Sequence, residues 1–363
     1  KDFKLLRHYV ALSLILTLII SLLLTIPTVT ASRLLLAWMH TPENIIAMAD
    51  AYIKVIFAGI LLTMAYNVLS GILRGIGDSR TPLYFLILSS VLNIILDVVL
   101  IVYTGLGTAG AAYATIIAQG VSAVLCFFYM YRKYEILRTR HEDYYLDSAG
   151  VKNMLAIGVP MALNYSITAI GTMIMQSAVN VFGSSVVAAF TAASKVSNIA
   201  TQSMPTLGTA MATYCGQNLG AGKYDRIYAG MRQGLFLCFG AAATAAAICI
   251  FGGRFIVSWF VSNPSEEIFS SAMQYLTIAS WFFLPLAMIF LYRNALQGLD
   301  QGLIPMLSGV IELACRFGVI ALIPASTGFF GVCFADPAAW AGAGIPLFIT
   351  YLLWEHRMKQ CSK

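Results

Sequence analysis

The sequence predicts an all-α integral membrane protein built from two pseudo-symmetric helical lobes, and three observations support this fold class. Hydrophobic residues make up 59% of the 363 residues and charged residues only 10%, whereas soluble domains are about a quarter charged. Ten apolar segments are long enough for a bilayer-spanning helix, which needs about 20 residues. Sequence motifs also recur between the two halves of the chain, as they do in repeat architectures.

The predicted spans set the order of elements along the chain. They are roughly 8–30, 48–71, 82–104, 107–131, 151–180, 184–214, 229–251, 268–292, 303–325 and 331–354. The apolar segments 31–40 and 252–262 are too short to cross, and each holds one Arg and one Trp, so we expect interfacial helices there. The charged stretch 132–149 is the expected linker between an N-terminal lobe, 1–131, and a C-terminal lobe, 150–363.

The repeat aligns the two halves residue by residue. Five pairs share one constant offset in the numbering: Leu73/Leu296, Gly75/Gly298, Pro82/Pro305, Thr104/Thr327 and Gly105/Gly328. Two more pairs share a second, slightly shorter offset: Arg33/Arg254 and Trp38/Trp259. Carried backward, the first offset pairs Asp2 with Asp225, so the spans 151–180 and 184–214 have no counterparts. We therefore expect four spans in the first lobe and six in the second. Roughly 73 further residues, carrying two spans, would give the first lobe six spans as well.

Lys and Arg residues are distributed unevenly between the connections. Seventeen of the 22, Arg293 among them, fall in alternate connections and at the chain ends, against only Arg33 and Arg254 on the opposite side. Positive residues in short loops mark the cytoplasmic side, so we expect both termini in the cytoplasm and the protein in a bacterial plasma membrane. The net charge of +6 is then a topology signal, and we expect membrane lipid but no nucleic acid as a partner.

Motifs and cysteine spacing give no sign of an enzyme. The seven cysteines show neither metal-ligand spacing nor a disulfide framework. No metalloprotease, nucleophile-elbow or Walker sequence is present, so we expect no enzymatic activity and no cofactor. Matched halves with a transport path between them are how secondary transporters are built. The sequence therefore predicts a transporter, which must be coupled to an ion gradient if transport is uphill.

Asp97 is the candidate ion-binding residue of the first lobe. It lies inside the third span, with Asn93 one turn before it on the same helix face. At 1.5 Å per residue, Asp97 is about 10 Å and Thr115 of the next span about 12 Å from the outer surface. The three side chains can therefore converge in the outer half of the first lobe, and a costly intramembrane charge such as Asp97 is a candidate for function. The alternative is a carboxylate capped by its neighbours for packing alone.

The second lobe carries charged residues within its spans. Glu312 and Arg316 are spaced i,i+4 on the ninth span, and we expect a structural ion pair, although either partner could face a cavity. Lys195 has no acidic residue within a turn, so it either faces a cavity or extends its charge toward water or a partner. Asp336 is near the outer end of the last span, and we expect it to stay hydrated.

Polar side chains of the fifth and sixth spans are candidates for a substrate cavity. They are Asn164, Thr168, Gln176, Asn180, Lys195 and Gln202. In lipid they should face inward, where they either bond between helices or line a wet cavity. Pro160, Pro205 and Pro285 free backbone carbonyls and permit bending, with irregular packing as the simpler explanation of each.

Three motifs carry a resemblance to a known family. They are Gly71-Ile-Leu-Arg-Gly-Ile-Gly-Asp-Ser-Arg-Thr-Pro82, Asn93-Ile-Ile-Leu-Asp97 and Met211-Ala-Thr-Tyr-Cys-Gly-Gln-Asn-Leu-Gly-Ala-Gly222. With them the whole chain resembles the multidrug and toxic compound extrusion (MATE) family. The resemblance implies twelve helices in two lobes, of which this chain has the equivalents of helices 3–6 and 7–12. It also implies a monomer that exports small cationic, amphipathic compounds in exchange for Na⁺ or H⁺.

The resemblance also implies a binding site for the coupling ion, Na⁺ or H⁺, in the first lobe. One bacterial branch of the family uses a first-helix Asp, an Asn-x-x-x-Asp pair and a sixth-helix Thr, and the last three match Asn93, Asp97 and Thr115. Another branch uses a seventh-helix carboxylate, which the stretch 164–168 lacks.

Rival functions remain open at this point. A flippase for lipid-linked sugars, from the same superfamily, would need a basic cavity, and only Lys195 and Arg316 are available in the second-lobe spans. An intramembrane enzyme or a receptor would not need matched halves.

Overall fold

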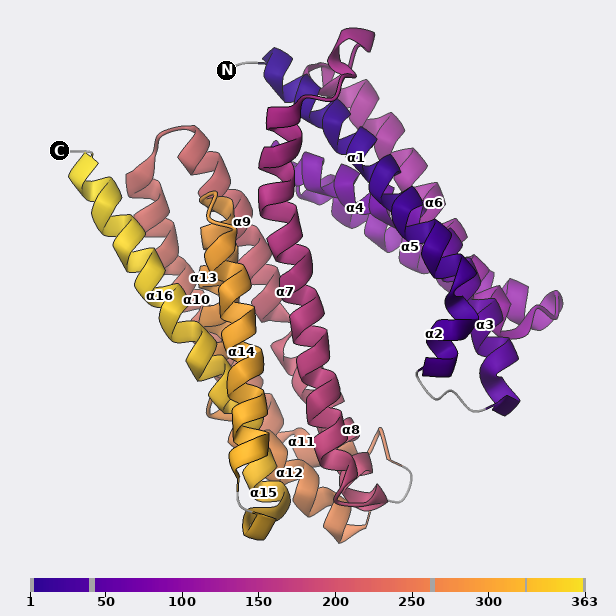
Figure 1. Ribbon diagram of the computed structural model, residues 1–363, viewed down its shortest axis with the longest axis vertical. Helices are drawn as coiled ribbons and strands as arrows, with labels where there is room; N and C mark the ends of the chain where they lie inside the picture. Colours follow the sequence, from indigo (N-terminus) through magenta and orange to yellow (C-terminus); the bar gives the residue numbers. More distant parts are fainter. Residues whose placement is uncertain (1–2, 39–42, 262–264, 324, 362–363) are drawn as a thin grey trace. The chain divides into compact units, whose positions relative to one another are not determined.

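The computed structural model describes residues 3–38, 43–261, 265–323 and 325–361 (Figure 1). The chain divides into two compact units, residues 1–152 and 153–363. Every regular element within the described ranges is a helix, which confirms the all-α fold class. Asp2 of the repeat alignment lies outside the described residues, as do the ends of three predicted segments at 39–40, 262 and 324.

In its described residues, the first unit consists of six α-helices and three short helical turns. They are α1 (Phe3–Thr30), α2 (Ser32–Trp38), α3 (Glu43–Ala58), α4 (Ile60–Gly75), α5 (Arg80–Val98), η1 (Val99–Tyr103), α6 (Gly107–Lys133), η2 (Glu135–Leu137) and η3 (His141–Asp143). α6 packs against α3, α4 and α5, and α1 packs against α3 and α4. α6 is therefore the helix that organises this unit.

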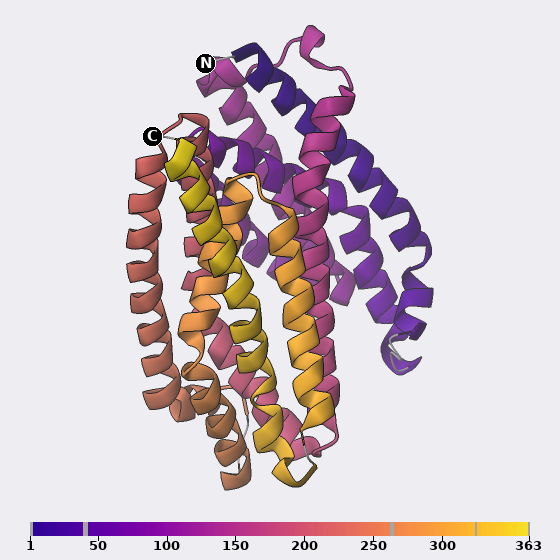
Figure 2. The ribbon, with the colours of Figure 1, turned by 60° about the vertical axis from the view of Figure 1, so that its left-hand side comes forward.

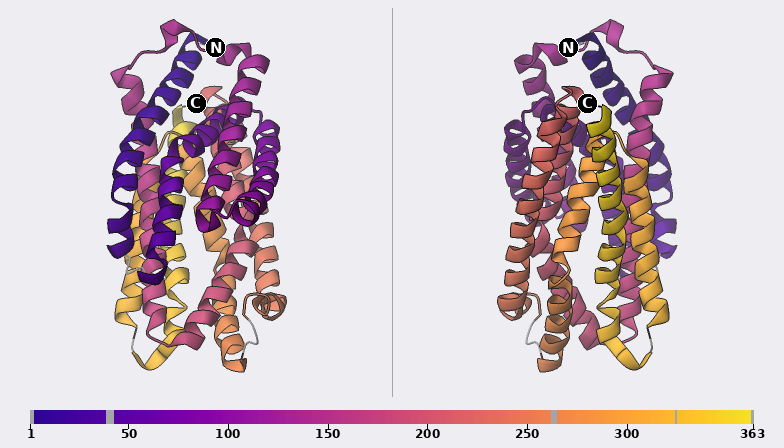
Figure 3. Two further views of the ribbon diagram at one scale, coloured as in Figure 1. Left: turned by 90° about the vertical axis from the view of Figure 1, so that its right-hand side faces the viewer. Right: turned by 90° about the vertical axis from the view of Figure 1, so that its left-hand side faces the viewer.

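The second unit is a larger helical bundle. Its elements are α7 (Ser148–Asn180, which begins in the first unit), α8 (Ser184–Thr201), α9 (Ser203–Gly220), α10 (Tyr224–Phe251), α11 (Gly253–Val257), α12 (Glu266–Ser280), α13 (Phe283–Gly298), α14 (Leu303–Leu322), η4 (Ala325–Thr327), α15 (Gly328–Val332) and α16 (Ala335–Cys361). α13 packs against α9, α10 and α16, and α14 packs against α16 (Figure 2). The right-hand view of Figure 3 shows α10, α13 and α16 side by side.

The described helices include seven that are long and apolar enough to cross a membrane. Two bent pairs, α3 with α4 and α12 with α13, raise this number to nine if each pair is one span. The bends measure 44° and 52°. The predicted span 184–214 corresponds to α8 and α9, which are separated at Gln202. Each of these three predicted spans is therefore interrupted and does not form one continuous helix.

Local features explain two of the interruptions and accompany the third. Pro205 and Pro285 are the third residues of α9 and α13, and a proline cannot donate the bond that would continue the preceding helix. At the α3–α4 bend, a Cβ on Gly59 would lie 2.1 Å from the Ile116 side chain of α6. The absence of a side chain at Gly59 thus lets α6 pack directly against the bend.

The element boundaries repeat at the offsets found in the sequence. α4 and α13 end at the matched glycines Gly75 and Gly298, and the starts of α5 and α14, at Arg80 and Leu303, have the same separation. α1 and α10 are both 28 residues long. The short helices α2 and α11 follow them at the two places where short helices were expected. The two units thus share a common helical plan.

The turn after α4 is repeated after α13 down to its hydrogen bonds. The Asp78 N–H donates to the Leu73 carbonyl and the Gln301 N–H donates to the Leu296 carbonyl, both at 2.9 Å. This is the helix-ending pattern that places one residue in the left-handed region. Gly77 has φ 96° there, but its counterpart Asp300 has φ 63° and is the only described residue other than glycine with positive φ.

Replacing Asp300 with glycine is expected to stabilise the protein. The left-handed conformation brings the Cβ of an L-residue close to its carbonyl, and glycine avoids that cost, so the free energy of unfolding should rise by about 0.5–1 kcal/mol. Thermal unfolding in detergent measures the change, and Gly77→Asp should lower stability in the same assay. A lower melting temperature for Asp300→Gly would contradict this account of the turn.

Candidate functional site

The candidate ion site of the first unit lies between α5 and α6. The Asn93 side-chain amide on α5 donates to the Thr115 hydroxyl on α6 at 3.3 Å, and this hydroxyl donates to the Ala111 carbonyl at 3.0 Å. The hydrogen bond joins residues 22 positions apart. Two of the three predicted side chains are therefore in direct contact, and Asp97 lies one helical turn beyond Asn93 on α5.

Asp97 has a buried oxygen that is not satisfied. Its Oδ1 is buried and has no hydrogen-bond partner among the described residues. A buried carboxylate oxygen without a partner is costly in a low-dielectric interior, so this oxygen is available to a cation. The Asp97 carboxylate, the Asn93 amide and the Thr115 hydroxyl supply oxygen atoms, which are the ligands that hard cations prefer. The chemistry of these ligands fits Na⁺.

The backbone next to Asp97 is irregular. α5 passes directly into a π-helical turn, Val99–Tyr103, and such turns occur frequently at functional sites. On α6, a Cβ at Gly110 would lie 2.8 Å from the Leu100 carbonyl oxygen of this turn. The glycine therefore lets α6 approach the π-helical turn closely. Gly110 gave no signal of this role in the sequence.

A second polar site, in the second unit, joins four charged side chains and a tyrosine. Glu312 pairs with Arg293 of α13 at 2.9 Å and with Arg316 on its own helix at 3.4 Å. Arg316 also pairs with Asp336 of α16 at 2.9 Å. The Tyr275 hydroxyl of α12 donates to Asp336 at 2.9 Å. Two arginines and two carboxylates make this network formally neutral, and each charged side chain is at most 13% exposed.

This network corrects two sequence-based expectations. Asp336 was expected to be hydrated, but it is bound by Arg316 and Tyr275. Arg293 was counted among the loop charges, but it lies within α13, is 8% exposed and pairs with Glu312. The expected Glu312–Arg316 contact is present but is only one edge of the network. The sequence showed the i,i+4 pair because both residues lie on one helix, whereas the other partners come from three different helices.

The first four cavity candidates lie on α7 and make hydrogen bonds along this helix or to α14. Asn164 is buried and donates to the Pro305 carbonyl of α14 at 2.9 Å, which is a bond between helices. Thr168 donates to the Asn164 carbonyl at 3.0 Å. On the same helix, Gln176 donates to Asn180 at 3.0 Å. A common cavity for these residues stays a prediction.

The remaining two candidates lie on or just after α8. The Lys195 ammonium is 5.4 Å from the centre of the Phe260 ring, within reach of a cation–π interaction. Gln202 is exposed and occupies the break between α8 and α9. The Lys195 contact shows that this cation has an aromatic partner within its own unit.

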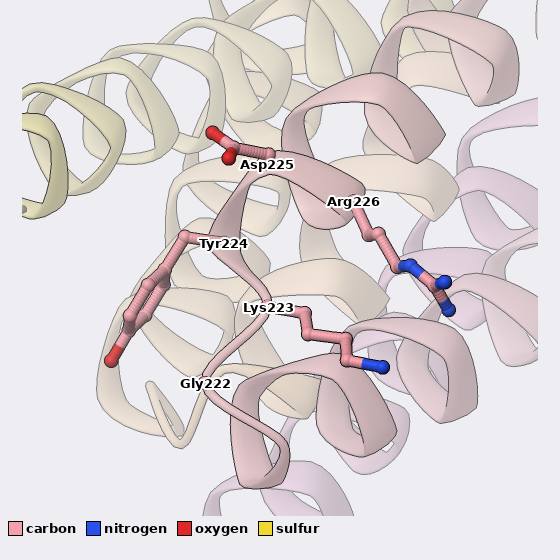
Figure 4. A pocket seen from close by; sticks show the side chains of 5 residues that line it. All are labelled: Gly222, Lys223, Tyr224, Asp225 and Arg226. Carbon is pink, nitrogen blue, oxygen red and sulfur yellow. The ribbon is translucent and has the colours of Figure 1, made fainter.

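A depression of about 390 Å³ lies at the turn between α9 and α10. It is lined by residues 222–226, and Figure 4 shows Lys223 and Arg226 pointing to one side of the turn while Tyr224 points away. None of the predicted site residues lines it. Gly222 has φ 66° here and ends α9 in the same way that Gly77 ends α4. The depression is thus a consequence of the turn geometry and its charged side chains.

Asp78, within the first family motif, stabilises the start of α5. Its carboxylate accepts from the Thr81 backbone at 3.1 Å, from the Thr81 hydroxyl at 2.7 Å and from the Tyr134 hydroxyl at 2.6 Å. Burial opposes ionisation, but the hydrogen bonds from Tyr134 and Thr81 outweigh it and lower the pKa of the Asp78 carboxyl from 3.8 to about 2. Asp78 therefore connects the α4–α5 turn to the end of α6.

The contribution of Asp78 to stability should depend on pH. A lowered pKa in the folded state means that the contribution is complete above the ordinary value near 3.8 and is lost as the pH falls toward 2. We expect Asp78→Asn to be less stable than the parent protein at pH 6, with a difference that shrinks between pH 4 and 2. Denaturant unfolding across this range measures it. A difference that stays constant with pH would argue against an ionised Asp78 in this role.

The arrangement defines a class of protein. Several bilayer-length helices, two units with a shared plan and polar sites inside them are the features of a multi-pass membrane protein of the secondary-transporter type. Residues 1–99 and 160–322 match the profile of the MatE family. The chain belongs to this family, the multidrug and toxic compound extrusion transporters.

Individual relatives agree with this assignment. The chain is 29% identical over 303 residues to the "Probable multidrug resistance protein YpnP" of Bacillus subtilis, a match that covers 83% of this chain and 67% of the relative. It is 29% identical over 257 residues to the "Probable multidrug resistance protein YoeA" of the same organism, covering 69% of this chain and 55% of the relative. The chain thus spans about two thirds or less of these proteins.

A solved structure has the same fold. The "Crystal structure of MATE in complex with MaL6" superposes with a TM-score of 0.91 and covers 99% of this chain and 81% of that chain, at 21% sequence identity.

Proposed function

We propose that the protein is a secondary active efflux transporter that exchanges small cationic or amphipathic compounds for Na⁺ or H⁺. The observation that carries the proposal is Asp97, whose buried oxygen is unpartnered beside the contacting pair Asn93 and Thr115. A site that binds and releases a cation is what coupling to an ion gradient requires, and the family membership supports export as the direction. We expect the protein to act as a monomer.

The test is transport by the full-length protein in proteoliposomes. Ethidium movement is followed under an imposed Na⁺ gradient at equal pH, then under a pH gradient without Na⁺, with empty liposomes and a gradient-collapsing ionophore as controls. We expect one of the two gradients to drive ethidium against its concentration difference. The gradient that does so identifies the coupling ion. The absence of movement under both gradients would contradict the proposal.

We also propose that the protein lies in the bacterial plasma membrane with both termini in the cytoplasm. The charge asymmetry supports this orientation even after Arg293 is removed from the loop residues, because sixteen loop charges remain against two. In a cysteine-free background, a cysteine at Ser184 should react with an impermeant thiol reagent added to intact cells, whereas one at His141 should react only after lysis. The reverse pattern would invert the topology.

The lipid-linked sugar flippase finds no support in the described residues. The substrate of such a flippase carries a pyrophosphate group, which would need free basic side chains in the protein. Arg316, however, is bound by two carboxylates, and Lys195 lies against Phe260. The second unit therefore presents no uncompensated arginine cluster in the part of the chain that the structure describes.

A further inference from the structure

The repeat places Arg316 of the second unit at the position of Asn93 in the first. The starts of α5 and α14 have the same separation in the sequence as the motif prolines Pro82 and Pro305. Asn93 and Arg316 are matched at this same offset. An arginine thus occupies the position at which the first unit has an amide of its candidate ion site.

The two side chains also make corresponding contacts between helices. Asn93 reaches from α5 to Thr115 on α6, and Arg316 reaches from α14 to Asp336 on α16. α6 follows α5 and η1 after Gly105, and α16 follows α14 after η4 and the short helix α15, which begins at the matched glycine Gly328. The partners themselves are not matched by the offset, because Thr115 corresponds to Ala338 and Asp336 to Tyr113. Equivalent positions on α5 and α14 therefore carry an amide in a neutral pair and a guanidinium in an ion pair.

The charge balance of the two sites differs accordingly. In the first unit the Asp97 carboxylate has a buried oxygen without a partner among the described residues. In the second unit, Ile320 occupies the position equivalent to Asp97, and the carboxylates of the network are bound by guanidinium groups. One site is left with a negative charge to be neutralised, whereas the other is already neutral.

Space for the arginine is provided by a glycine on another helix. A Cβ on Gly171 of α7 would lie 2.0 Å from Nη1 of Arg316, so only glycine lets the guanidinium extend to this place. Glu312 on α14 and Asp336 on α16 bind the guanidinium directly. Arg293 on α13 in turn binds Glu312, and Tyr275 on α12 binds Asp336. Arginine stays protonated at any physiological pH, so it is a permanent cation held between two carboxylates.

We propose that the Arg316 guanidinium is a built-in substitute for the coupling cation, so that the second lobe binds no exchangeable ion. The inference rests on the proposed function, because it assigns ion exchange to Asp97 alone. It also defines what removal of the charge would do. Without Arg316, the network would hold two carboxylates and one arginine, and the remaining negative charge would be neutralised by an added cation or a proton.

The experiment measures ion-dependent stability of the full-length protein in detergent, without transport. All variants carry Asp97→Asn, which removes the first-lobe site. Melting temperatures are compared in choline chloride, in NaCl and in dilute guanidinium chloride at neutral pH, and in choline chloride at mildly acidic pH. Asp97→Asn alone should show no saturable response. Adding Arg316→Met should create one, as a rise in melting temperature with Na⁺, guanidinium or acid.

Two matched controls separate a new cation site from general destabilisation. Arg316→Lys keeps the positive charge and should not gain the response. Arg316→Met with Asp336→Asn is neutral again, because Arg293 and Glu312 remain, and it should not gain the response either. A response confined to Arg316→Met supports the proposal.

Three results would overturn the inference. One is a saturable cation response in Asp97→Asn with Arg316 intact, which can be measured even if Arg316→Met does not fold. Another is a folded Arg316→Met variant that responds to none of the three cations, and the last is an equal response in the neutral control. If the proposed transport fails instead, the parent protein shows no gradient-driven ethidium movement, and the stability assay still reports on Arg316 independently.

Discussion

Asp97→Asn is expected to reduce gradient-driven efflux to the level of empty liposomes while the protein stays folded. The substitution keeps the size of the side chain and removes the charge that would attract and release the coupling ion. It also removes an unpartnered buried carboxylate oxygen, which is costly in the folded state. The melting temperature should therefore be unchanged or higher. Parallel ethidium transport and thermal unfolding of the purified variant measure both effects.

The neighbouring residues provide graded controls for Asp97. Asn93→Ala and Thr115→Ala each remove one neutral oxygen ligand and one end of the hydrogen bond between α5 and α6. They should weaken coupling, visible as a higher ion concentration for half-maximal efflux, without abolishing it. Full ion-coupled efflux by Asp97→Asn would exclude this residue as the coupling site, even if the two neighbouring variants were impaired.

Glu312→Gln is expected to have the largest effect on stability. Glu312 is buried and bridges Arg293 and Arg316, so its neutralisation leaves two buried arginines with Asp336 as their one carboxylate in the network. Removing one partner from a buried ion pair costs about 3–5 kcal/mol. We expect a marked loss of folded protein in the membrane and a strongly lowered melting temperature, both measurable by fluorescence-detected size exclusion with heating.

An exposed ion pair and a compensated variant serve as controls for Glu312. Glu266 pairs with Arg254 at 2.7 Å at an exposed position, and such pairs contribute about 0–1 kcal/mol, so Glu266→Gln should be nearly neutral. Glu312→Gln combined with Arg293→Met restores neutrality and should recover much of the lost stability. If Glu312→Gln were as stable as Glu266→Gln, the network would not hold the second unit together.

Much of the local organisation could be predicted from the sequence. Apolar length identified seven of the ten predicted spans as continuous helices, and the offset of the sequence repeat reappears in the starts of α5 and α14. Helical periodicity placed Asn93 and Asp97 on one face of α5 and paired Glu312 with Arg316, because residues four apart are neighbours on a helix. These inferences succeeded where the relevant contacts lie within one helix or follow directly from its length.

Contacts between helices were beyond the reach of the sequence. The spans were drawn without the interruptions at Gly59 and Gln202, and Arg293 and Asp336 were assigned to water although both lie in the buried network. The Tyr275–Asp336 bond joins residues 61 positions apart, and no local pattern marks such a pair.

The physical reason is the solvent. In a soluble protein, the polar face of a helix shows which side meets water, but lipid is as apolar as the protein core, so hydropathy does not fix how a membrane helix is rotated against its neighbours. The sequence by itself therefore determined the membrane class, the repeated plan and the intrahelical pairs. Only the tertiary structure decided which carboxylates are paired with arginines. It also decided that one buried oxygen of Asp97 has no hydrogen-bond partner among the described residues.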